Sequence, residues 1–184
     1  MFQYPLNYRY FLQTGVTVKV PRMVSLETTA ACQLACKMCD RSSLKRETIF
    51  MPDEVFKAAI KNIAPYRIKV NFNGIGEPLL DRNLPDRIAY ACSQGIDQIG
   101  MVTNGLLLTP RIAGELIAAG IKRITISLDG NDQHSHESGH SGADYETVAS
   151  NIECLVSLKK KLSADSLDVV LRVTVQKSNL AVIP

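Results

Sequence analysis

The chain has 184 residues, of which 46% are hydrophobic and 21% are charged, and its formal net charge at pH 7 is +3. This composition excludes a disordered, fibrous or membrane protein and is typical of one globular domain. The longest basic run, at residues 159–161, is interpreted as a solvated helix end rather than a nucleic-acid surface. No apolar run approaches the roughly 20 residues of a membrane helix, and the N-terminus lacks a signal-peptide layout, so neither membrane spanning nor secretion is expected.

Segments rich in β-branched residues alternate with helical patterns from residue 22 onward. They predict strands at residues 22–28, 67–73, 97–103, 122–128 and 167–176. Amphipathic periodicity predicts helices near residues 52–64, 83–94, 110–119 and 144–162. In the third helix, Thr109 is expected at the N-cap, Pro110 in the first turn and Gly120 just past the end. Strands separated by such helices pair in parallel through right-handed crossovers, so we predict an α/β fold that forms a parallel partial (β/α) barrel.

The expected organisation is an N-terminal arm or helix over residues 1–21, packed under the sheet, and one core over residues 22–184. The chain ends soon after the fifth predicted strand, where Ser178 and Asn179 look like the opening of a further helix. We therefore expect a barrel that is truncated after the fifth strand.

Three of the five cysteines, Cys32, Cys36 and Cys39, fall within eight residues. Grouped thiols are typical of a metal or redox site in a reducing compartment, which predicts a cytoplasmic protein rather than a disulfide framework. Thiolates are soft ligands that suit zinc or an iron-sulfur cube, and a cube held by three cysteines leaves one iron open. Structural zinc needs a fourth protein ligand. The candidates for that ligand are three histidines of one loop, His134, His136 and His140.

Unusual residues also follow the second, third and fourth predicted strands. Parallel α/β folds bind ligands beyond the carboxyl ends of their strands, so these residues are expected to converge on one rim. Each motif alone is a common turn, but Ser127 and Asp129 offer a hydroxyl and a carboxylate suited to a ribose or an amino acid. The full set, in chain order, is Gly74, Ile75, Gly76, Glu77 and Pro78, then Thr103, Asn104 and Gly105, then Ser127 and Asp129.

The three cysteines form a CxxxCxxC motif that resembles the cluster loop of the radical S-adenosylmethionine (SAM) superfamily. The resemblance covers about residues 22–180 and is to the branch of the molybdopterin-precursor cyclase and the peptide-maturing and sulfatase-maturing enzymes. Met38 stands where the family often carries an aromatic residue, and its apolar side chain could still cover a cluster. Residues 74–78 resemble the family's Gly-Gly-Glu-Pro motif, with Ile75 in the first glycine position.

The resemblance implies that Cys32, Cys36 and Cys39 hold a [4Fe-4S] cluster whose open iron is chelated by SAM. One electron would cleave SAM to methionine and a 5′-deoxyadenosyl radical, which takes a hydrogen atom from an organic substrate, with a peptide as one candidate. By the same resemblance the backbone of residues 74–78 meets the amino group of SAM. The remaining implied contacts are Ser127 on the ribose or carboxylate, Thr103 and Asn104 along the site, and Arg172 on the carboxylate.

An electron donor such as flavodoxin, or an anionic substrate, is expected to meet Lys45 and Arg46 near the cluster, although a plain surface explains these residues equally well. Two other functions stay open: a zinc or iron-sulfur module that does not cleave SAM, and an inactive fragment. The family's sixth unit and its C-terminal extension are missing, so we expect either an N-terminal part of a longer enzyme or a need for a second protein.

Three further assignments concern residues outside the motifs. Cys92 is expected to be a small buried hydrophobe, because it lies at helical spacing from apolar neighbours. Cys154 is expected to be an exposed thiol. The three histidines are expected to be solvent-exposed loop residues.

Overall fold

Five parallel strands form one sheet in the computed structural model, which describes residues 21–44, 47–177 and 179–180. All five predicted strands are confirmed, and the sheet runs in chain order from the first strand to the last. Each strand is shorter than predicted. The strands are β1 (Met23–Leu26), β2 (Lys69–Phe72), β3 (Ile99–Thr103), β4 (Arg123–Ser127) and β5 (Asp168–Arg172).

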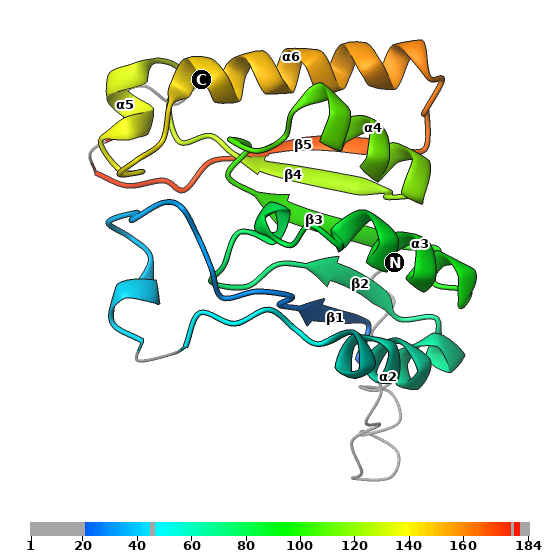
Figure 1. Ribbon diagram of the computed structural model, residues 1–184. Helices are drawn as coiled ribbons and strands as arrows, with labels where there is room; N and C mark the ends of the chain where they lie inside the picture. The colour runs from blue at the N-terminus through cyan, green and yellow to red at the C-terminus, as the bar shows by residue number, and fades with distance from the viewer. Residues whose placement is uncertain (1–20, 45–46, 178, 181–184) are drawn as a thin grey trace, which may run out of the picture.

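Helices follow each of the first four strands and cover one face of the sheet (Figure 1). The Thr109 hydroxyl accepts the backbone N–H of Ile112, and Gly120 ends the same helix with a φ of 98°, so the predicted cap and stop are confirmed. Short 3-10 turns lie at Asp40–Ser42, Ala64–Tyr66 and Pro78–Leu80. The helices are α2 (Asp53–Ile63), α3 (Leu84–Ser93), α4 (Pro110–Ala119), α5 (Gln133–Glu137) and α6 (Tyr145–Lys161).

The hydrophobic core lies between these helices and the sheet. Successive side chains of a strand point to opposite faces of the sheet, so Val70 and Phe72 of β2 are buried while Asn71 between them is only partly buried. Phe56 of α2 packs against Phe72 with ring centroids 6.2 Å apart. Each such buried side chain contributes about 1.5–3 kcal/mol of hydrophobic free energy, which anchors the helices on the sheet.

The sheet is an open partial barrel, as predicted. Its five strands do not close, and a hollow of about 220 Å³ on the sheet is lined by side chains that include Asn71, Thr125 and Arg172. Strand β5 ends at Arg172, earlier than predicted, because the backbone N–H of Thr174 turns to a carboxylate oxygen of Asp129 at 2.8 Å.

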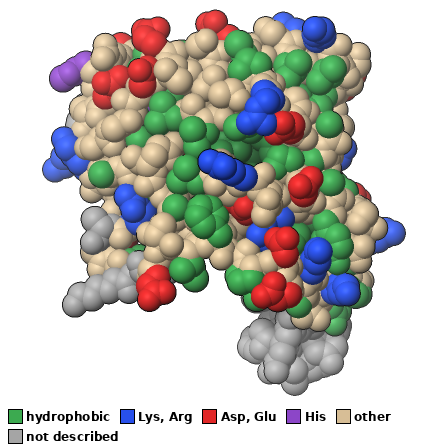
Figure 2. Space-filling model, in the orientation of Figure 1, with side chains coloured by type: hydrophobic (Ala, Val, Ile, Leu, Met, Phe, Trp, Pro, Cys, Tyr) green, Lys and Arg blue, Asp and Glu red, His purple; other side chains and the backbone are tan. Residues whose placement is uncertain are grey.

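The surface carries mixed charge. On the face drawn in Figure 2, basic and acidic side chains are interspersed rather than gathered into a basic stripe. The three lysines at 159–161 form the last turn of α6, which confirms the predicted helix end. Across the described ranges, no helix combines the length and the apolar character that crossing a membrane requires. Residues 1–20 of the predicted arm, which was expected over residues 1–21, lie outside the described residues, as does Ser178.

Candidate active site

The cysteine loop lies at the carboxyl edge of the sheet, directly after β1 (Figure 1). Its backbone pairs with the segment that follows α5: the N–H of Ala35 donates to the carbonyl of Ser141 at 2.9 Å, and the N–H of Lys37 donates to that of Gly139 at 3.0 Å. Residues 139–142, here called the clamp segment, therefore hold the loop from one side. Met38 also faces this segment, because a Cβ on Gly139 would lie 3.1 Å from the Met38 methyl.

The three thiols of the loop are free and partly exposed. Burial raises the pKa of Cys36 to about 11, with the neighbouring thiols Cys32 and Cys39 adding to the shift. Burial likewise raises the pKa of Cys32. Both thiols are thus protonated at neutral pH, and a metal must displace their protons to bind.

The donor set of the loop fits iron. Three thiolates from one short loop are soft ligands, which suit an iron-sulfur cluster. Within the described ranges, no three cysteine, histidine, aspartate or glutamate side chains are grouped closely enough to hold a single metal ion. A [4Fe-4S] cluster does not need such a group, since each thiolate binds a different iron.

The loop at residues 74–78 packs against the end of β1. The carboxylate of Glu27, a residue that the sequence did not single out, accepts the N–H of Ile75 at 2.6 Å and that of Gly76 at 3.3 Å. A Cβ on Gly76 would lie 2.0 Å from the carbonyl oxygen of Thr29, so only glycine fits there. The N–H of Glu77 donates to the carbonyl of Ala31 at 2.7 Å, which joins this loop to the cysteine loop.

The buried Glu77 carboxylate joins its own loop to the end of β3. It accepts hydrogen bonds from the hydroxyl of Thr103 at 2.7 Å, the N–H of Asn104 at 2.8 Å and the N–H of Leu79 at 3.0 Å. Burial raises the pKa of this carboxyl, and the three donated hydrogen bonds oppose that rise. Pro78 follows as the first residue of a 3-10 turn. Glu77 and Thr103 thus set the positions of their loops.

Asn104 connects the end of β3 to the cysteine loop. Its side-chain oxygen accepts a hydrogen bond from Gln33 at 3.2 Å, and its Nδ2 lies 4.0 Å from the sulfur of Cys32. On the next two strands, Ser127 and Arg172 are register partners at the carboxyl ends of β4 and β5. The structure therefore brings the predicted residues of five strand ends to one edge.

Asp129 and two histidines form a buried network that the sequence analysis missed. Asp129 Oδ2 lies 2.8 Å from His140 Nε2, and its Oδ1 accepts the N–H of Thr174. The N–H of Asp129 donates to His136 Nδ1 at 3.2 Å, and His140 Nδ1 lies 3.2 Å from the sulfur of Cys36. Both carboxylate oxygens of Asp129 are thus engaged within the chain.

The prediction that the three histidines are exposed loop residues is correct only for the exposure of His134, because His134 and His136 lie on helix α5. His136 and His140 are 1% and 6% exposed, and only His134 faces solvent. The reason is the short helix α5, whose N-cap Asp132 accepts the N–H of Ser135 at 2.7 Å and turns the segment onto the end of β4. The spacing of Asp132 and Ser135 is the local signal that could have found this helix.

The other two cysteines lie on helices. Cys92 is partly buried and packs against the core, in line with its predicted role as a small hydrophobe. Cys154 is also partly buried, and not fully exposed as predicted. Lys45 and Arg46 lie outside the described residues.

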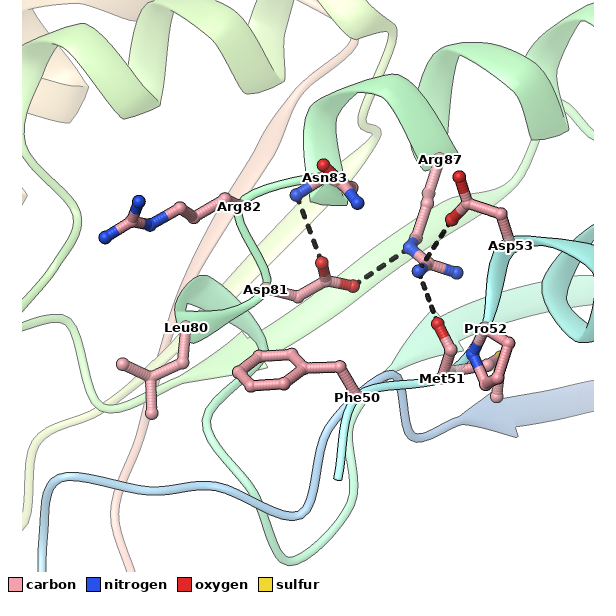
Figure 3. A pocket seen from close by; sticks show the side chains of 9 residues that line it. All are labelled: Phe50, Met51, Pro52, Asp53, Leu80, Asp81, Arg82, Asn83 and Arg87. Atoms are coloured by element: carbon pink, nitrogen blue, oxygen red, sulfur yellow. Dashed lines mark hydrogen bonds and ion pairs between the residues drawn. The ribbon is translucent and has the colours of Figure 1, made fainter. Parts of the chain in front are cut away.

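A cavity of about 920 Å³ lies beside this rim and contains none of the predicted site residues (Figure 3). Its polar wall is the buried side chain of Arg87, which pairs with Asp81 at 3.0 Å and Asp53 at 2.9 Å. The same guanidinium donates to the carbonyl of Met51 at 2.6 Å. Because two carboxylates neutralise Arg87, we assign this network to holding α3 against the segment that enters α2.

Residues 26–177 match the radical SAM superfamily, and the chain belongs to that family. Members of the family use a [4Fe-4S] cluster and SAM, and the cysteine loop described above is the part of the chain that fits the cluster.

Among curated relatives, the chain is similar to a probable GTP 3′,8-cyclase of Methanococcus maripaludis, with 32% identity over 72% of this chain and 44% of the relative. It is also similar to an AdoMet-dependent heme synthase of Methanosarcina barkeri, with 32% identity over 73% of this chain and 39% of the relative. The chain thus spans less than half the length of these two relatives.

Solved structures share the fold. SuiB of Streptococcus suis, bound to its precursor peptide SuiA, superposes with a TM-score of 0.72 at 13% identity, over 93% of this chain and 37% of SuiB. BtrN in complex with AdoMet and 2-DOIA superposes with a TM-score of 0.59 at 19% identity, over 84% of this chain and 58% of BtrN. These similarities confirm the radical SAM type of partial barrel.

Proposed function

We propose that the chain is the core of a radical SAM enzyme that removes a hydrogen atom from an organic substrate. The observation that carries this proposal is the loop of three free thiols, held at the carboxyl edge of the sheet in a chain that belongs to this family. Cys32, Cys36 and Cys39 are the residues that would hold the cluster. When bound, the cluster and SAM supply the one-electron chemistry, and the protein supplies their placement.

The rest of the rim would bind SAM. The backbone of residues 74–78 lies next to the cysteine loop and would receive the amino group of SAM, while Met38 would cover the cluster. Ser127 and Arg172, which are register partners, would take the ribose and carboxylate, because a guanidinium matches a carboxylate with two parallel hydrogen bonds. Asn104, close to Cys32, would line the same space.

The proposal extends to the substrate and to partner proteins. A peptide is one candidate, since the peptide-bound SuiB shares this fold. An electron donor such as flavodoxin would supply the electron, and the five free thiols suit the reducing cytoplasm. We further propose that the open side of the sheet is completed by more of the same protein or by a second one, which would supply the substrate contacts.

The test is anaerobic reconstitution with iron and sulfide, followed by addition of SAM and dithionite and an assay for 5′-deoxyadenosine. The wild type should release 5′-deoxyadenosine, and a variant with alanine at all three loop cysteines should not. A Cys92→Ala, Cys154→Ala double variant is the matched control, because it removes two thiols away from the rim and should retain the product. A metal-loaded wild type that leaves SAM intact would instead support a metal-binding module.

Binding of SAM can be measured apart from its cleavage by calorimetry on the reconstituted protein. Arg172→Gln removes a charged hydrogen-bond donor, which is worth about 1.5–3 kcal/mol, so the Kd for SAM should rise by roughly 10-fold or more. Arg111→Gln changes an exposed arginine of α4 and should leave the Kd unchanged. An unchanged Kd in Arg172→Gln would remove Arg172 from the SAM site.

A further inference from the structure

The contact between His140 and Cys36 is flanked on both sides by backbone hydrogen bonds. The carbonyls of Gly139 and Ser141, the residues before and after His140, accept the N–H groups of Lys37 and Ala35, which lie on either side of Cys36. His140 Nδ1 is therefore set 3.2 Å from the Cys36 sulfur by the main chain as well as by its own side chain.

The His140 ring is also fixed on its other sides. Its Nε2 faces Asp129 Oδ2 at 2.8 Å, and its face stacks on the ring of His136 with centroids 4.7 Å apart. His136 is itself held by the N–H of Asp129. At 6% exposure, the His140 ring has little freedom to leave the Cys36 sulfur.

We propose that His140 is a positioning residue for the cluster ligand Cys36, and that Asp129 acts on the cluster through His140 rather than by contact with SAM. The inference rests on the proposed function, in which Cys36 binds iron. With the cluster bound, the Cys36 sulfur carries no proton, so the contact is a hydrogen bond when Nδ1 carries the hydrogen, and the Asp129 carboxylate holds the ring in place from the side of Nε2. Hydrogen bonds to ligand sulfurs are one of the factors that set the reduction potential of an iron-sulfur cluster.

The direction of the shift in reduction potential follows from the charge of the cluster. Reduction adds a negative charge to the cluster, and a donor at a ligand sulfur stabilises the reduced form more than the oxidised form. Removing the donor should therefore make the reduction potential more negative. A residue that served only the folding of α5 would not produce this shift in protein that still holds its cluster.

The experiment compares the wild type with five variants: His140→Phe, His140→Asn, His134→Phe, Asp129→Asn and the His140→Phe, Asp129→Asn double variant. Phenylalanine keeps the ring but has no donor, whereas the asparagine amide can replace Nδ1 as a donor to sulfur. His134 is the matched control, because it is exposed and lies on the neighbouring helix α5. The reduction potential is read by an EPR-monitored titration of the reconstituted cluster, and the amide hydrogen exchange of residues 33–38 is read in the protein before reconstitution.

We expect a more negative potential and faster exchange in His140→Phe, a potential closer to that of the wild type in His140→Asn, and no change in His134→Phe. Asp129→Asn should shift the potential in the same direction as His140→Phe, and the double variant should shift it no further, because Asp129 acts through His140. A wild-type potential and wild-type exchange in His140→Phe would overturn the proposal, as would additive shifts in the double variant.

The two readouts separate this inference from the proposed function. A wild type that takes up no cluster would contradict the proposed function, and the exchange comparison would still decide whether His140 and Asp129 hold the loop. If His140→Phe alone failed to bind the cluster, the reduction potential of the cluster in His140→Asn would test the donor role of His140. A potential equal to that of the wild type would support this role, and a potential as negative as that of Asp129→Asn would oppose it.

Discussion

The Glu77 carboxylate accepts the backbone N–H of Asn104 at 2.8 Å and thereby ties the loop after β2 to the end of β3. The same carboxylate also holds Thr103 and Leu79, so all of its contacts are with donors. These hydrogen bonds explain the burial of the Glu77 carboxylate without a ligand. Glu77 is a support of the rim as the structure stands, and direct contact with SAM remains a prediction.

Glu77→Gln should destabilise the fold. The glutamine NH2 must face at least one of the backbone or hydroxyl donors that the carboxylate now satisfies, and a buried unsatisfied donor costs about 1–3 kcal/mol. Chemical denaturation should show this loss in the free energy of unfolding. Glu115→Gln, at an exposed position of α4, is the control and should change the stability by less than about 0.5 kcal/mol. Equal stability of the two variants would contradict the role given to Glu77.

Gly76→Ala should lower stability because the new methyl has no room. Its Cβ would lie 2.0 Å from the carbonyl oxygen of Thr29 and 2.8 Å from that of Ala31, and backbone atoms must move to admit it. Overpacking of this kind costs about 1–3 kcal/mol. In Gly114→Ala, on α4, the nearest atom is a Leu158 methyl at 3.8 Å, so the same methyl should stabilise the helix by up to about 1 kcal/mol. Opposite shifts in thermal midpoint are the expected result.

Arg87→Met should be strongly destabilising, since it leaves the buried Asp81 carboxylate without its cation (Figure 3). Breaking one partner of a buried ion pair costs about 3–5 kcal/mol. Adding Asp81→Asn to this variant should recover part of the loss, so that the double variant is more stable than the sum of the single losses predicts. Additive losses, measured by urea denaturation, would show that Arg87 and Asp81 do not act as a pair.

Acid should destabilise the wild type through His136. Burial lowers the pKa of this histidine below its usual value of 6.5, with the nearby His140 adding to the shift and Asp129 and Glu137 opposing it. The neutral ring is favoured in the folded state, so this contribution to stability is full above pH 6.5 and is lost as the pH falls through the folded-state pKa.

The variant that tests this pH dependence is His136→Asn, whose side-chain oxygen can still accept the N–H of Asp129. Its free energy of unfolding should fall less than that of the wild type between pH 7 and pH 5, a window set by the ordinary histidine pKa of about 6.5. His134→Asn, at the exposed position, should follow the wild type. Parallel curves for His136→Asn and the wild type would assign the acid sensitivity to other groups.

Local patterns were enough to predict the strands, the main helices and the edge at which the site residues meet. Thr109, Pro110 and Gly120 mark their helix through interactions that span only a few residues, so the sequence contains all that is needed. The motifs after each strand were expected at one rim because parallel strands place their carboxyl ends together, and this expectation needs topology only.

The contacts that were missed depend on residues far apart in the chain. Glu27 binds Ile75 and Gly76, which lie 48 and 49 residues further on, and no local pattern marks such a partner. His140 was expected at the surface because its neighbours are small and polar, but its burial is created by Asp129 at the end of β4. Tertiary packing therefore decides the surroundings of the cysteines, although the cysteines themselves are evident from the sequence.

The contact between the clamp segment and the cysteine loop also determines when the cysteine loop takes its final form during synthesis. Cys36 and His140 are 104 residues apart, so the cysteine loop cannot reach its final form until β4 and α5 have been synthesised and have folded. Contacts between such distant residues form late in folding, because a long stretch of chain must be closed before they are made. A nascent chain that has only just exposed its three thiols thus offers iron a flexible peptide, and the shaped site follows about a hundred residues later.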